Sequence, residues 1–186
     1  MSDHDRLLTL LAERSARRGH FTLASGRQST LYIDARLTTM SPDGLALIGP
    51  LGLAALRGAG WQITAVGGLT LGADPVSYAI AYASAVAGTP LRAFTVRKEA
   101  KAHGTGRLIE GPFHAGDRVA VIEDVITTGG SALRAVDAIR AAGGVVAGVL
   151  AVVDREEGGR EALEGAGLSV LALARASEIV RRLPAI

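Results

Sequence analysis

The chain has 186 residues, of which 48% are hydrophobic and only 4% aromatic, and its formal net charge at pH 7 is +2. This length predicts one domain with a full core, and the small, dispersed positive charge argues against nucleic acid as a partner. The absence of cysteine excludes disulfides, thiol catalysis and thiolate zinc sites, and fits a reducing cytoplasm. No apolar run reaches the roughly 20 residues needed to span a membrane, and the N-terminus lacks the apolar core of a signal peptide. We therefore expect a cytoplasmic protein with no membrane partner.

The N-terminal part predicts a helix, a hairpin and a second helix. Residues 3–18 place leucines on one side, aspartates near the start and arginines near the end, so they predict an amphipathic helix. Residues 21–36 predict two short strands around a polar turn at 25–29. Pro42 predicts the start of a helix that runs to about Leu56, with Ser41 as its N-cap.

The remaining sequence alternates predicted strands with predicted helices. The strands are expected at residues 63–66, 91–96, 107–110, 119–122, 145–153 and 168–173. The helices are expected from Pro75 to about residue 85, through 133–139, at 160–165 and at 177–183, the last with Ser177 as its N-cap. This alternation predicts an α/β fold with a central parallel sheet covered by helices on both faces.

Residues 119–144 are the most informative stretch. An apolar strand at 119–122 leads into Glu123 and Asp124, then into a turn of threonine, glycine and serine at 127–131, and then into a helix. Backbone N–H groups and the helix dipole make such a turn an anion site, while the acids suit sugar hydroxyls or waters on Mg²⁺. The alternative is an ordinary strand-to-helix turn, but two adjacent acids at the end of a buried strand need a partner or a ligand. The stretch predicts a site for a phosphorylated sugar.

Two further stretches carry charge near strand ends. Residues 97–106 hold three cations and a histidine followed by two glycines, which indicates either a mobile lid over a polyanion or a solvated loop; the phosphate turn favours the lid. Arg155 follows the strand at 145–153, at the edge where open α/β sheets bind ligands, although Glu156 or Glu157 could simply pair with it. The glycine-rich loop at 67–75 either approaches a ligand or allows close helix–sheet packing.

These motifs resemble a known family. The strand, acid pair and turn at 119–131 resemble the phosphoribosyl diphosphate (PRPP) signature of type I phosphoribosyltransferases. Residues 97–104, RKEAKAHG, resemble the catalytic loop of orotate phosphoribosyltransferases nearly residue for residue. Residues 21–34 resemble that family's hood strands, and Asp154 with Arg155 its orotate-side arginine. The resemblance implies a type I phosphoribosyltransferase fold, α/β, in one domain of residues 1–186 with a hood formed mainly by residues 1–38.

The resemblance also implies a reaction and a set of site residues. The reaction transfers the 5-phosphoribosyl group from PRPP to orotate, giving orotidine 5'-monophosphate and diphosphate in de novo pyrimidine biosynthesis. The implied catalytic residues are Lys101, His103 and Asp124. The implied PRPP-binding residues are Arg97, Lys98, Lys101, His103, Glu123, Asp124, Val125, Ile126, Thr127, Thr128, Gly129, Gly130 and Ser131. The implied orotate-binding residues are Thr127, Arg155, Tyr32 and Ile33.

The cofactor and the assembly follow from the same resemblance. It implies Mg²⁺ that is held mainly by PRPP rather than by a set of protein ligands, and a loop at residues 70–72 that lines the diphosphate. In the family the lid lysine and histidine reach into the neighbouring subunit's site, so the resemblance implies a homodimer.

Two positions depart from the family pattern. Ala24 and Leu71 stand where some members carry a lysine, so one contact to orotate or PRPP at each place is missing or supplied elsewhere. Two other functions remain as alternatives. A phosphoribosyltransferase for a purine base does not need the RKEAKAHG loop or an arginine for a carboxylate. A non-catalytic regulator that senses PRPP and binds nucleic acid needs a broad basic face or an added DNA-binding helix pair.

Overall fold

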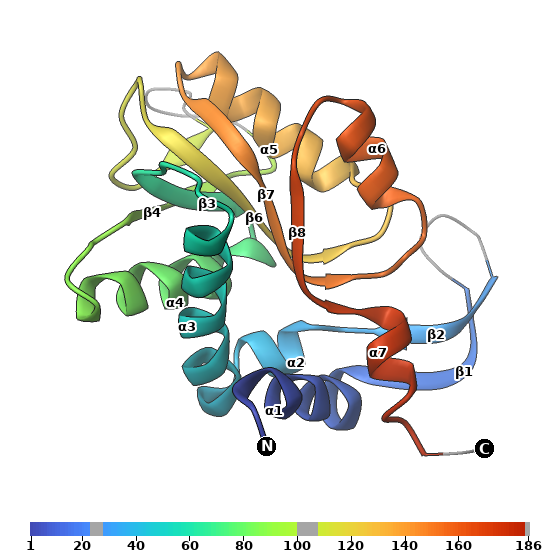
Figure 1. Ribbon diagram of the computed structural model, residues 1–186. Coiled ribbons are helices and arrows are strands. Elements are labelled where there is room, and N and C mark those ends of the chain that lie inside the picture. The colour runs from blue at the N-terminus through green and yellow to red at the C-terminus, as the bar shows by residue number, and fades with distance from the viewer. Residues whose placement is uncertain (23–27, 100–107, 185–186) are drawn as a thin grey trace.

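The computed structural model describes residues 1–22, 28–99 and 108–184, and within them the chain forms a two-stranded and a six-stranded sheet (Figure 1). The small sheet pairs β1 (Ala16–Thr22) with β2 (Gln28–Ile33) in antiparallel fashion. The large sheet has the order β5-β4-β3-β6-β7-β8. Its strands are β3 (Ala65–Leu69), β4 (Arg92–Val96), β5 (Ile109–Glu110), β6 (Arg118–Ile126), β7 (Val145–Asp154) and β8 (Val170–Arg175). All neighbours are parallel except β5, which runs antiparallel to β4, and this confirms the predicted central parallel sheet.

Helices cover both faces of the large sheet, with α3 and α4 on one face and α5 and α6 on the other (Figure 1). The helices are α1 (Asp3–Leu10), α2 (Arg36–Thr39), α3 (Pro42–Gly58), α4 (Ala73–Val86), α5 (Gly130–Ala141), α6 (Gly159–Gly165) and α7 (Ala176–Val180), and a π-helical segment η1 (Leu11–Ser15) continues α1. None of the helices in the described part of the chain is long and apolar enough to cross a membrane.

The core is divided by β6 into two clusters. Ala120 and Ile122 pack with residues of α1, α3 and α4, whereas Val119 and Val121 pack with residues of α5. This division follows from the strand geometry, because successive side chains point to opposite faces of a sheet. The central strand is therefore apolar on both sides, as the run at 119–122 predicted.

The small sheet lies beside α1, α2 and α7, at the end of the large sheet where β8 leads into α7 (Figure 1). The Asp34 N–H donates to the Ser15 carbonyl at 2.9 Å. The Arg18 guanidinium donates to the Val180 carbonyl at 3.1 Å, and Arg182 pairs with Asp5 at 2.8 Å. The small sheet, which we call the hood, is thus bonded to α7, and the segment after α7 is bonded to α1.

Three predicted boundaries are wrong, the first two because pairing partners lie far away in the sequence. The helix predicted over residues 3–18 ends at Ser15, since Ala16 to Arg18 pair with β2. The strand predicted at 63–66 runs from Ala65 to Leu69, since those residues pair with β4. The predicted N-cap Ser177 already lies inside α7, which begins at Ala176.

The strand predicted at 119–122 is also longer than expected. It continues to Ile126 because β7 pairs with it as far as Asp154. Glu123 and Asp124 therefore lie within β6, not after it. This difference decides how deeply the two acids are buried.

Candidate active site

A cleft of about 340 Å³ opens where the parallel strands end, which is the edge of an open α/β sheet where ligands bind. Its walls come from the end of the hood, from the loop after β3 and from the ends of β6 and β7. The lining residues are Tyr32, Ile33, Asp34, Ala35, Arg36, Leu69, Thr70, Leu71, Gly72, Lys98, Glu123, Asp124, Val125, Thr127, Ser131, Arg134 and Arg155.

The turn after β6 forms a smaller pocket that shares residues with the cleft. This pocket measures about 80 Å³ and is lined by Glu123 and by residues 125–132. Gly129 adopts a left-handed conformation with φ +81°, which glycine accepts without strain, and α5 begins immediately after it. The first N–H groups of a helix have no partner within the helix, so the wall of this pocket has the donors and the dipole that an anion site requires.

The acid pair lies between this turn and the rest of the cleft. Glu123 is only 6% exposed, and its Oε1 has no hydrogen-bond partner among the described residues. Burial, together with the neighbouring charge of Asp124, raises the pKa of Glu123 to about 8. Burial also raises the pKa of Asp124, against the effect of the Val125 N–H that donates to its Oδ1 at 2.8 Å. A buried carboxyl group with an unpartnered oxygen is suited to receive a hydroxyl of a ligand.

The glycines expected in one loop lie partly within β3 and partly in the loop after it, and they have two different functions. A Cβ on Gly67 would lie 2.5 Å from the Phe94 carbonyl oxygen, and one on Gly68 would lie 2.0 Å from that of Ile122, so these two allow close packing in the sheet. A Cβ on Gly72 would lie 2.4 Å from an oxygen of Asp124, so this glycine allows the loop to approach the acid pair. Both alternatives left open by the sequence are therefore present: close packing within β3 and approach to the acid pair in the loop after it.

The same loop is fixed by side-chain bonds. Thr70 donates to Asp74 at 2.7 Å, and Thr95 donates to the other oxygen of Asp74 at 2.8 Å. The peptide bond between Thr70 and Leu71 is cis. The loop is thus held against β4 with residues 70–72 on the cleft.

Arg155 is buried between the hood and the main sheet. It is 7% exposed, and its Nη2 donates to the Leu31 carbonyl at 3.1 Å and to Glu157 Oε1 at 2.5 Å. The pairing with Glu157 that the sequence left open is therefore observed. Among the described residues, the buried Nε of Arg155 has no hydrogen-bond acceptor, so the guanidinium keeps one donor that no protein group satisfies.

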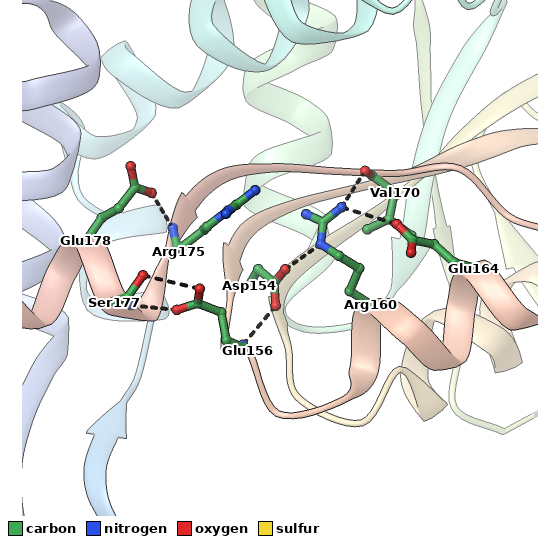
Figure 2. Close-up of polar contacts among 8 residues, drawn as sticks. All are labelled: Asp154, Glu156, Arg160, Glu164, Val170, Arg175, Ser177 and Glu178. Carbon is green, nitrogen blue, oxygen red and sulfur yellow. Dashed lines mark hydrogen bonds and ion pairs between the residues drawn. The ribbon is translucent and has the colours of Figure 1, made fainter.

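The loop that carries Arg155 is anchored by the polar network of Figure 2. Asp154 accepts bonds from the Glu156 N–H at 2.9 Å and from Arg160 Nε at 2.7 Å. Arg160 also donates to the Val170 carbonyl at 2.9 Å, and Glu156 accepts from the Ser177 N–H at 2.7 Å. The network connects β7 with α6, β8 and α7, so the residues on both sides of Arg155 are fixed and its position is set in advance.

Most of the residues expected at the site come together. The cleft contains Tyr32, Ile33, Lys98, Glu123, Asp124, Val125, Thr127, Ser131 and Arg155, and the adjoining pocket adds Ile126, Thr128, Gly129 and Gly130. Arg97 is not among the lining residues; it lies 3.6 Å from Glu110 in an ion pair and donates to the Glu99 carbonyl. Lys101, His103 and Ala24 lie outside the described residues.

Two cations of the cleft were not expected from the sequence, Arg36 and Arg134. Arg134 could have been found, because it follows Ser131 by three residues and so lies on the same face of α5. Arg36 carries no comparable signal, since only the folding of the hood over the sheet brings it to the cleft.

Comparison with known proteins gives a consistent result, although no protein-family model matches the chain. The chain is 46% identical to an orotate phosphoribosyltransferase from Aquifex aeolicus over 183 residues, which cover 97% of this chain and 99% of that protein. Its fold is similar to that of the Mycobacterium tuberculosis H37Rv orotate phosphoribosyltransferase crystallised with Fe(III) dicitrate, with a TM-score of 0.85, 46% identity and coverage of 96% and 99% of the two chains. The structure of that M. tuberculosis enzyme in complex with PRPP matches with a TM-score of 0.82 and 42% identity over 96% of this chain and 99% of the other. With this identity over nearly the full length of both chains, the chain belongs to the orotate phosphoribosyltransferase family.

Proposed function

We propose that this protein transfers the 5-phosphoribosyl group from PRPP to orotate, giving orotidine 5'-monophosphate and diphosphate. The observation that carries the proposal is the order of groups along the cleft: an anion turn, an acid pair in which Glu123 is buried, and an arginine fixed beside the hood. Family membership supports the same assignment. By the same reasoning we place the protein in de novo pyrimidine biosynthesis in the cytoplasm.

PRPP fits the cleft with its three parts on three sets of residues. The 5'-phosphate would bind the turn from Thr127 to Ser131, where N–H groups and hydroxyls can donate to it. The ribose hydroxyls would meet Glu123 and Asp124, which form no ion pair within the described residues and are not exposed. The diphosphate would then lie toward Lys98 and the loop at 70–72.

Orotate would bind on the hood side of the cleft. Its carboxylate would accept from Arg155 Nε, the donor for which no described residue serves as acceptor, and a charge-assisted bond to a buried guanidinium is a strong one. The backbone at Tyr32 and Ile33 would border the ring, and Thr127 would contact it from the turn.

The chemistry requires charge stabilisation more than a strong base. Departure of diphosphate builds positive charge on the anomeric carbon and negative charge on the leaving oxygens, and orotate is already an anion. Lys101, His103 and Arg97 are proposed to stabilise the leaving group, and a closed lid would exclude water from the reactive sugar.

Mg²⁺ is the proposed cofactor, held mainly by the phosphate oxygens of PRPP. Magnesium in such sites is commonly bound through one or two carboxylates plus substrate phosphates, and Asp124 offers a carboxylate on the cleft next to the loop that would line the diphosphate. When bound, the ion would neutralise charge on the leaving group.

The apolar face formed by α3 and α4 supports a homodimer. A groove of about 1050 Å³ runs between these helices, and Tyr82 and Val86 on its wall are 74% and 72% exposed. Aromatic residues are enriched in the cores of protein interfaces. The face also adjoins the start of the expected lid, because Tyr78 of α4 bonds to Thr95 of β4 at 2.8 Å. We propose that a second copy binds at this face. Tyr82→Glu should then convert a dimer into monomers in light scattering, and an unchanged mass would contradict this interface.

The decisive experiment measures which base the protein consumes. Purified protein with PRPP and Mg²⁺ should consume orotate, measured by its loss of ultraviolet absorbance, and should leave adenine, guanine and hypoxanthine unchanged. Consumption of a purine instead would support the purine enzyme. PRPP binding without consumption of any base would support the non-catalytic regulator.

A further inference from the structure

Arg36 is a cation of the cleft for which the sequence suggested no function. It is the first residue of α2, immediately after the hood strand β2 (Figure 1). It lines the main cleft together with Leu71, and the same two residues also line a second hollow of about 550 Å³ between the hood and the loop after β3. Arg36 therefore lies next to the position where some family members carry a lysine.

The guanidinium of Arg36 is fixed on one side and available on the other. Its Nε donates to Asp34 Oδ1 at 2.8 Å and its Nη2 to Asp34 Oδ2 at 2.9 Å. Nη1 has no hydrogen-bond partner in the described part of the chain, and the side chain is 49% exposed. The guanidinium is planar, and the Asp34 carboxylate holds it in position. Its remaining N–H donors keep a geometry that is suited to binding phosphate.

The acid pair lies within electrostatic reach of this guanidinium. Burial is the main cause of the raised pKa of Asp124, and the charge of Arg36 partly opposes this rise. The pKa of Arg36 is raised mainly by Asp34 and to a smaller extent by Asp124. Asp34 itself has a lowered pKa because of its bond to Arg36. The guanidinium and the acid pair thus belong to one site.

We infer that Arg36 binds the diphosphate of PRPP and supplies the cation that other members of the family place at the position of Leu71. This inference rests on the proposed function. With the 5'-phosphate on the turn at 127–131 and the ribose over the acid pair, the diphosphate extends toward Lys98 and the loop at 70–72, and Arg36 is the cation that shares the second hollow with this loop. Because Asp34 already orients the guanidinium, binding a polyanion there would cost little additional side-chain entropy.

The test measures binding of magnesium diphosphate and of PRPP by calorimetry. Arg36→Ala should weaken both by about ten- to a hundredfold, because a charge-assisted hydrogen bond is lost, and should leave orotate affinity unchanged. Adding Leu71→Lys to the Arg36→Ala protein should restore most of the lost affinity by returning a cation to the same hollow. Arg36→Lys should fall between wild type and Arg36→Ala, since it keeps the charge and loses the fork.

A matched control separates ligand binding from hood stability. Arg14 forms a similar two-bond pair with Asp43, at 2.8 and 2.6 Å, outside the cleft, so Arg14→Ala should leave diphosphate binding unchanged. Unaltered diphosphate binding in Arg36→Ala would overturn the inference. A loss that Leu71→Lys does not restore, or an equal loss of orotate affinity, would also overturn it. Failure of the proposed function would appear differently, as wild-type protein that does not consume orotate with PRPP.

Discussion

The burial of Glu123 leads to a prediction about stability and pH. In the folded protein this carboxyl group keeps its proton up to about pH 8, whereas its usual pKa is 4.5. Between these two values the folded state binds one more proton than the unfolded state. The free energy of unfolding must therefore fall as the pH rises through this window.

The magnitude follows from the two pKa values. One pKa unit corresponds to about 1.36 kcal/mol, so the difference between 4.5 and about 8 corresponds to about 5 kcal/mol. Over the practical range from about pH 5.5 to 8, about 3 kcal/mol of this is lost. That is a large part of the ~5–15 kcal/mol by which a typical domain is stable.

The substitution Glu123→Gln removes the titration while keeping the shape. Urea unfolding at one protein concentration can be followed by the fluorescence of Trp61, the single tryptophan. The free energy of unfolding should fall steeply with rising pH in wild type and much less in the variant. Contributions from the other ionisable groups are common to both proteins and cancel in the difference. Glu164→Gln, at an exposed glutamate of α6, should follow wild type. Parallel curves for wild type and Glu123→Gln would refute the reasoning.

Three further predictions concern the site. Arg155→Ala should weaken orotate binding by about ten- to a hundredfold with a smaller effect on PRPP, and unchanged orotate affinity in calorimetry would contradict the assignment. Lys101→Ala should slow the chemical step by about a hundredfold or more while sparing orotate binding, and an unchanged single-turnover rate would exclude that function. Gly159→Ala would place a Cβ 2.5 Å from the Thr127 carbonyl oxygen, so it should cost about 1–3 kcal/mol and weaken phosphate binding. Its control is Gly165→Ala in the same helix, where an added Cβ meets nothing within 4 Å; equal melting temperatures for the two variants would contradict the packing argument.

Local patterns were sufficient for the fold class and for the anion turn. Alternating apolar strands and helices specify a covered parallel sheet because each element must bury its apolar face. The turn at 127–131 could be recognised because its glycines, hydroxyls and following helix are adjacent in the sequence. Ser41 as the cap of α3 was predictable for the same reason, and its hydroxyl does accept the Gly44 N–H at 3.2 Å.

Contacts between distant segments decided the remaining features. Ala16 leaves the first helix because it pairs with Ile33, and β6 extends through the acid pair because β7 pairs with it to the end. Packing between elements far apart in the chain buries Glu123, which raises its pKa. The same kind of packing places Arg36 and Leu71 on one cleft. Local periodicity and propensity carry no information about such pairings, so the sequence alone predicts the type of site, whereas tertiary packing determines which charges it contains and how strongly they act.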